Sequence, residues 1–169
     1  MKTVGVILQV FFFVLLLVGA GCEPVPSESL SETAQLSVYT RYTPVKIDIM
    51  PLTEFICTGG DEEPSKIRVY VSLLDAFDCQ MKTPAVFRFE LYEYIQRSAE
   101  PKGGRIIIWP DIDLIDTVEN NQHWRDFLRA YEFNLDFEPE SNQSYILQAT
   151  CLCPDGKRLS AEFGLKHTK

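Results

Sequence analysis

The segment YILQATCLCPDGKRLSAEFGLK, from Tyr145 to Lys166, decides the fold. Apolar and polar residues alternate on both sides of PDGK, which carries the proline and glycine of a tight turn. A strand with one buried face produces this period of two, so the segment predicts a β-hairpin. Its inward positions are expected to be Tyr145, Leu147, Ala149, Cys151 and Cys153 on the first strand, and Leu159, Ala161, Phe163 and Leu165 on the second.

Two further segments alternate in the same way. KIRVYVSLL begins at Lys66, and its inward residues are expected to be Ile67, Val69, Val71 and Leu73, opposite Arg68, Tyr70 and Ser72. FRFELYEYI begins at Phe87, and its inward residues are expected to be Phe87, Phe89, Leu91 and Ile95, opposite Arg88, Glu90, Tyr92 and Tyr94. Both segments therefore predict strands that bury one face.

Weaker patterns complete the predicted fold. LSVYT near Leu36, VKIDIM near Val45, RIIIW near Arg105 and YEFNLDF from Tyr131 bring the expected total to about eight strands. Helical spacing occurs in NQHWRDFLRAY and predicts about two helical turns there. We therefore expect an all-β fold over residues 35–169, an antiparallel β-sandwich of immunoglobulin-like or transthyretin-like type.

Composition places the chain among globular proteins of one domain. It has 169 residues, of which 46% are hydrophobic and 24% charged, with a formal net charge of -8. Nucleic-acid-binding proteins present clustered lysine and arginine, so this charge argues against nucleic acid as a partner.

The first residues have the composition of an export signal. Lys2 is followed by VGVILQVFFFVLLLVGAG, an apolar run that ends in small residues. An uncleaved membrane helix is the alternative, because the run approaches the roughly 20 residues that span a bilayer. The ending GAGC, in place of a basic flank, favours a secretory signal over residues 1–21.

The end of this run resembles the lipobox of bacterial lipoproteins. The residues concerned are Leu17-Val18-Gly19-Ala20-Gly21-Cys22, of which Gly19 departs from the usual leucine. The resemblance covers residues 1–26 and implies cleavage before Cys22, a diacylglycerol thioether on its sulfur, and acylation of the new amino group. It also implies attachment to the bacterial cell envelope. In that family an aspartate after the cysteine retains the protein in the inner membrane, and Glu23 in its place favours the outer membrane or the periplasmic face.

The residues after Cys22 are predicted to form a flexible tether. EPVPSESLSETA has the proline, serine and glutamate content of a flexible linker, so we expect residues 22–34 to separate the lipid from the folded domain. Without residues 1–21 the chain keeps 15 basic and 24 acidic side chains, a formal charge of -9. Such a charge disfavours binding to anionic lipid by electrostatics alone.

Four cysteines remain in the predicted domain: Cys57, Cys79, Cys151 and Cys153. In an exported chain an even number favours disulfides. Cys151 and Cys153 point the same way on one strand, so we expect no bond between them and a bond from at least one of them to Cys57 or Cys79. A four-thiolate zinc site is the alternative, but zinc ribbons need two close pairs and the chain has one.

Chemistry-bearing patterns are weak elsewhere. Asp111, Asp113, Asp116 and Glu119 cluster as calcium ligands would, but without the central glycine and fixed spacing of a calcium loop. His123 and His167 are the near-neutral bases; we expect the first to be packed and the second to lie at a frayed end. The sequence thus predicts no enzyme, no metal and no cofactor.

A binding surface is predicted from the outward positions of two strands. Tyr70, Arg88, Tyr92 and Tyr94 stand opposite the apolar faces, and tyrosine and arginine are enriched where proteins bind. We therefore expect a non-catalytic envelope lipoprotein that binds or scaffolds another envelope component, a protein or a glycan. A carbohydrate-binding or carbohydrate-cleaving sandwich is one alternative. The other is an assembly subunit of a secretion machine, because KIRVYVSL is loosely similar to an early strand of the transthyretin-like lipoproteins of type VI secretion.

Overall fold

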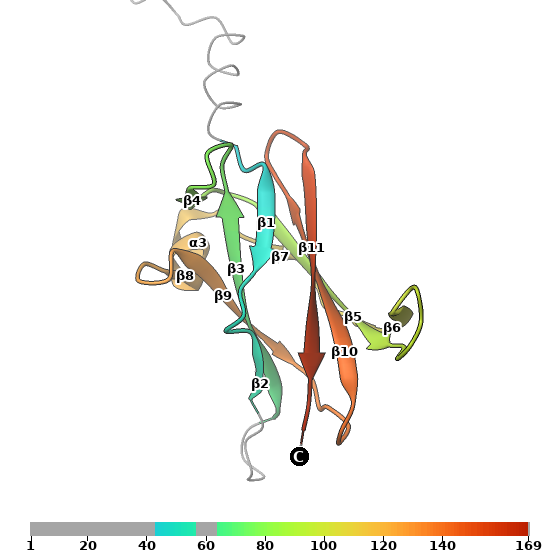
Figure 1. The fold of residues 1–169 in the computed structure, drawn as a ribbon. Helices are drawn as coiled ribbons and strands as arrows, with labels where there is room; N and C mark the ends of the chain where they lie inside the picture. Colours follow the sequence, from blue (N-terminus) through green and yellow to red (C-terminus); the bar gives the residue numbers. More distant parts are fainter. Residues whose placement is uncertain (1–42, 57–63, 169) are drawn as a thin grey trace, which may run out of the picture. The chain divides into compact units, whose positions relative to one another are not determined.

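The alternating segments of the chain form two antiparallel sheets that pack face to face (Figure 1). The computed structural model describes residues 43–56 and 64–168. Every strand pairing within them is antiparallel, which confirms the expected all-β sandwich. Eleven strands occur instead of about eight, because four of them are two or three residues long and too short to show a period.

One sheet has six strands. Its central strands are β3 (Lys66–Leu74) and β9 (Ala130–Asp136), and the others are β1 (Lys46–Ile49), β2 (Glu54–Ile56), β4 (Gln80–Met81) and β8 (Trp124–Arg125). The order is β1-β3-β9-β8, while β2 and β4 also pair with β3. The predicted strand LSVYT lies outside the described residues.

The other sheet has five strands. They are β5 (Val86–Tyr94), β6 (Lys102–Ile108), β7 (Ile112–Asp113), β10 (Ser144–Leu152) and β11 (Arg158–Lys166). The order is β11-β10-β5-β6, and β7 pairs with β5. β10 and β11 form the hairpin that the sequence predicts, with an unbroken register from Ser144↔Lys166 to Leu152↔Arg158.

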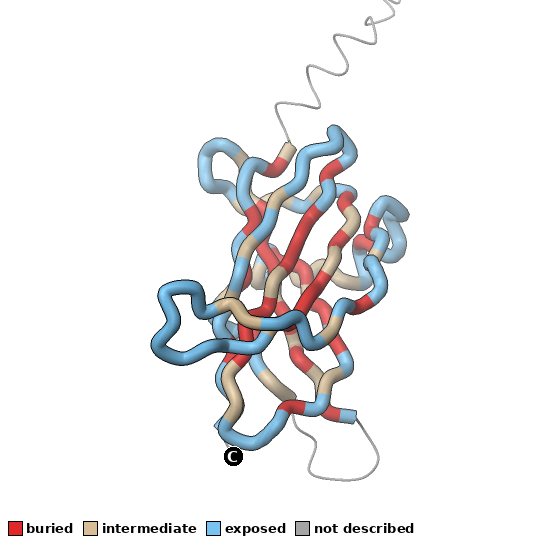
Figure 2. The backbone as a smooth tube through the Cα atoms, turned by 90° about the vertical axis from the view of Figure 1, so that its right-hand side faces the viewer, coloured by how far each residue is buried: buried red, intermediate tan, exposed pale blue. Residues whose placement is uncertain are grey.

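Side chains from the two sheets meet in an aromatic core. The rings of Phe87 and Phe89 on β5 lie 5.0 and 4.8 Å from the ring of Phe133 on β9. Tyr131 is fully buried, and its hydroxyl donates a hydrogen bond to the carbonyl of Thr83 at 2.8 Å. Figure 2 shows buried residues along the central strands and exposed residues in the loops. The alternation therefore marks the buried face because each sheet covers the other.

One inward position is corrected. Ile95, expected in the core, follows the last residue of β5 and its side chain is 47% exposed. Its backbone N–H donates a hydrogen bond to the carbonyl of Pro101 at 2.8 Å, which closes the turn between β5 and β6. The buried face of β5 therefore ends at Leu91, since Glu93 at the next inward position is already exposed.

The helix lies earlier than predicted. It is α3 (Thr117–His123), and the Oδ1 of Asp116 caps it by accepting hydrogen bonds from the N–H groups of Val118 and Glu119. The apolar spacing after Trp124 belongs to a hairpin instead, because Trp124 pairs with Tyr131 across β8 and β9. Of the residues that the structure describes, none belongs to a helix that could span a membrane.

Candidate functional site

The four predicted binding residues do not form one surface. Tyr70 lies on β3 in the six-stranded sheet, whereas Arg88, Tyr92 and Tyr94 lie on β5 in the five-stranded sheet. Each faces away from the core, and the outer faces of the two sheets look in opposite directions. The expectation of a single face is therefore wrong, because alternation distinguishes inside from outside but not one sheet from the other.

Arg88 is held by an acidic partner. Its Nε and Nη2 atoms lie 2.8 and 2.7 Å from the two carboxylate oxygens of Asp111, a bidentate pair on the outer face of the sheet. The hydrogen bonds from Arg88 lower the pKa of Asp111 below its ordinary value. The guanidinium of Arg88 therefore forms its ion pair within the chain, with Asp111.

The ring of Tyr92 is covered on one face. The Nζ atom of Lys102, at the start of β6, lies 4.1 Å from the ring centroid and 2.6 Å from Oε1 of Glu162 on β11. Lys102 also bonds to Gln148 on β10. This lysine therefore ties the β5–β6 hairpin to the outer face of the sheet.

Apolar side chains are exposed around the same hairpin. Tyr94 is 39%, Ile95 47%, Ile106 42% and Ile108 45% exposed, and we call these four residues the hairpin rim. Two register shifts interrupt the pairing of β5 with β6, so the strand cannot bury every second residue against the core. In Figure 1 this hairpin extends to the side of the two sheets.

Sequence reasoning missed Ile106 and Ile108 as surface residues. The signal was present in RIIIW, because three consecutive isoleucines cannot all face inward on a strand with period two. In the structure Ile107 is half-buried against the core, whereas its two neighbours are exposed.

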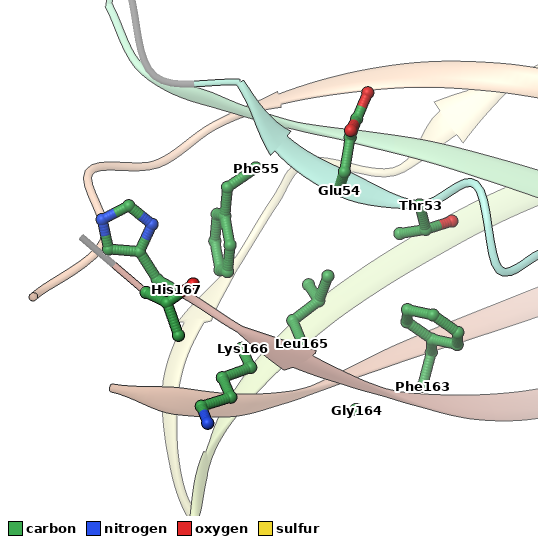
Figure 3. Close-up of a pocket in the computed structure, with 9 residues that line it drawn as sticks. Thr53, Glu54, Phe55, Phe163, Gly164, Leu165, Lys166 and His167 are labelled. Atoms are coloured by element: carbon green, nitrogen blue, oxygen red, sulfur yellow. The ribbon is translucent and has the colours of Figure 1, made fainter. Parts of the chain in front are cut away.

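A groove opens at the other side of the sandwich, between β2 and β11 (Figure 3). It has a volume of about 560 Å³ and is lined by Thr53, Glu54 and Phe55 and by the residues from Phe163 to Thr168. Phe55 points toward β11, and its ring lies 5.7 Å from Tyr145 and 5.6 Å from His167. The groove therefore has an aromatic wall and two strand edges as its borders.

The described cysteines are Cys79, Cys151 and Cys153. The sulfurs of Cys151 and Cys153 lie 3.9 Å apart and are buried, while Cys79 is exposed. The hydrogen bond to Cys153, together with burial, raises the pKa of Cys151. No two sulfurs among the described residues are at bonding distance. Cys57 and Cys22 lie outside those residues, so a bond to Cys57 and the lipid on Cys22 stay predictions.

Several of the polar residues considered for metal or acid–base chemistry have structural partners. Asp116 caps α3, and Asp113 accepts a hydrogen bond from the N–H of Ile115 at 2.9 Å. His123 is packed as expected: its Nδ1 lies 2.9 Å from the carbonyl of Glu132 and its ring stacks on Phe133. Across residues 43–56 and 64–168, no three histidine, cysteine or acidic side chains are grouped as metal ligands.

Comparisons with protein-family models, with curated proteins and with solved structures each found no match to this chain.

Proposed function

We propose that the chain is a non-catalytic lipoprotein of the bacterial cell envelope, anchored through Cys22 and docking another envelope protein through the hairpin rim. The observation that carries the docking proposal is the exposure of four large apolar side chains on one hairpin, between 39% and 47% each. Contiguous exposed apolar surface is characteristic of protein-binding sites. Residues 17–22 and the tether composition after them support the anchor.

The rim favours a protein over a glycan as the partner. Sugar-binding sites present a bare aromatic face, on which a sugar ring stacks, beside a polar cleft. Here Lys102 lies over the face of Tyr92, and three of the four rim residues are isoleucines. Isoleucine and tyrosine together fit an apolar protein surface, which would bury them on binding.

Metabolic labelling with a palmitate analogue tests the anchor. The full chain is expected to incorporate the label and to stay with the membrane fraction, because two or three acyl chains hold a protein on a bilayer almost permanently. Cys22→Ala is expected to abolish the label, whereas Cys79→Ser is the matched control and keeps it. Equal labelling of the wild type and Cys22→Ala would contradict the proposal.

Photo-crosslinking in the cells that make the protein tests the docking surface. A photoreactive amino acid in place of Ile108 of the full chain is expected to give a crosslinked product of one defined mass. Adding Tyr94→Ser and Ile106→Ser should reduce its yield roughly thirtyfold, since each rim side chain contributes on the order of 1 kcal/mol.

The matched control is Tyr70→Ser, on the outer face of the other sheet. This change is expected to leave the yield of the Ile108 product unchanged. Loss of the product in Tyr70→Ser, or its persistence when Tyr94 and Ile106 are changed, would show that the rim is not the docking surface.

A further inference from the structure

The outer edge of β11 presents unpaired backbone groups. In its ladder with β10, the N–H of His167 bonds to the carbonyl of Gln143, and the N–H of Cys153 bonds to that of Lys157, both at 2.9 Å. The register between these two points is unbroken, so the odd-numbered residues of β11 bond toward β10. The even-numbered residues therefore direct their N–H and C=O groups outward: Ser160, Glu162, Gly164 and Lys166.

This edge is open and regular. β11 is the last strand in the order β11-β10-β5-β6, and no strand within the described ranges pairs with its outer side. A Cβ atom built on Gly164 would meet no atom within 4 Å, so the space beside the middle of the edge is free. A straight edge without bulge or proline is the kind that accepts another strand.

The charged residues of this edge would pair with those of a second, antiparallel copy of the same strand. We propose that β11 pairs with β11 of a second copy of this chain, antiparallel and with the two-fold axis at Gly164. In that register Glu162 of each copy lies opposite Lys166 of the other, which forms two identical cross-strand ion pairs. Both residues are exposed, and Lys102 bonds to Oε1 of Glu162, which leaves Oε2 for the second copy.

The inner face of β11 supports the same register. Phe163 of each copy comes opposite Leu165 of the other, on the side where the groove between β2 and β11 opens. Phe163 is half-buried in the single chain, so pairing would complete the burial of its ring. The interface would thus have apolar pairs on the inner face of the sheet and opposite charges on the outer face, as expected for two paired strands.

A second register also matches charges but fits the surroundings less well. With the axis at Ser160, Arg158 would lie opposite Glu162, and the inner pair would be Leu159 with Ala161. Ser160 is near the start of β11. β1 contacts β11 in the sandwich and lies beside this part of it in Figure 1. The axis at Gly164 instead lies beside the open groove.

Cysteine crosslinking in the full chain, in its membrane, tests the pairing and its register. In a Cys79→Ser background, Gly164→Cys is expected to give a disulfide-linked dimer on mild oxidation, because Cα atoms paired at the axis are about 5.5 Å apart. Ser160→Cys is the matched control: eight residues would separate its two copies by about 27 Å, and no dimer is expected. The background chain alone sets the baseline.

Charge exchange then tests the proposed contacts by the yield of the Gly164→Cys dimer. Lys166→Glu and Glu162→Lys are each expected to lower the yield roughly tenfold, because both sites of the dimer then carry like charges. The double variant Glu162→Lys/Lys166→Glu should restore it. Dimer formation at position 160 instead of 164, crosslinking to another protein, or no rescue in the double variant would overturn the proposal.

Discussion

The five-stranded sheet has two edges that are built differently. At one edge, β6 pairs with β5 through two register shifts and exposes Ile106 and Ile108. At the other, β11 pairs with β10 along nine residues without a shift and exposes charged side chains. Irregular edges resist the addition of a further strand, whereas regular edges permit it. In the two proposals above, β6 contributes side chains to binding and β11 contributes backbone groups.

The space beside one glycine on each edge shows the same difference. Gly103 on β6 lies where the irregular hairpin folds onto itself, and a Cβ there would be 3.0 Å from Cγ1 of Ile95 and 3.1 Å from Cβ of Glu93. Gly164 on β11 has nothing within 4 Å of the same constructed atom. A Cβ atom at position 103 would thus crowd its neighbours, whereas the edge of β11 beside Gly164 is bare.

Replacing each glycine by alanine is the strongest test of the comparison. Gly103→Ala is expected to lower the free energy of unfolding by about 1–3 kcal/mol, because the Cβ of Glu93 is fixed by its backbone and cannot move away. Gly164→Ala is expected to raise it by a few tenths to about 1 kcal/mol, because alanine loses less conformational entropy than glycine in a strand. Urea unfolding of the full chain and both variants measures the two effects.

The two variants serve as controls for each other, since both make the same chemical change in an edge strand of one sheet. If they shift the unfolding midpoint equally, the close approach at Gly103 has no energetic weight and the two edges are equivalent. A shift in opposite directions supports the distinction between them.

Period two was enough to predict the interior of the sandwich. Phe87 and Phe89, Val69 and Val71, and the inward residues of the β10–β11 hairpin all lie on the inner faces, because a sheet covered on one side imposes that pattern directly. The sheet to which a strand belongs is set by long-range pairing, which leaves no local signal. Tyr70 and Tyr92 are both at outward positions in the alternation, but they lie on different sheets.

The region after Asp116 shows where local spacing misleads. Trp124 and Leu128 are four residues apart, as on a helix, yet Trp124 is in a strand and Leu128 in the turn that follows it. The helix begins where Asp116 can cap it and ends at His123, since Trp124 adopts extended backbone and pairs with Tyr131. Capping and cross-strand pairing together outweigh a spacing preference worth only a few tenths of a kcal/mol.

The smallest expected effect is electrostatic and belongs to the β6 edge. Nη1 of Arg105 on β6 lies 2.8 Å from Oε1 of Glu90, which is buried on β5. The hydrogen bond from Arg105 lowers the pKa of Glu90 below its ordinary value of 4.5. A carboxyl group whose pKa is lower in the folded state stabilises that state above pH 4.5 and loses this contribution as the pH falls through the folded value.

Glu90→Gln should therefore flatten the dependence of the free energy of unfolding on pH below about pH 4.5. The loss at neutral pH is expected to be roughly 1 kcal/mol or less, because the side chain of Arg105 is 52% exposed and water screens the pair. Arg105→Ala should flatten the same range, and the double variant should add little, since both changes remove one interaction. Urea unfolding between pH 3 and pH 7 measures this. If the acid dependence of both variants matched that of the wild type, the pair would not hold β6 to β5, and the bulged backbone alone would define that edge.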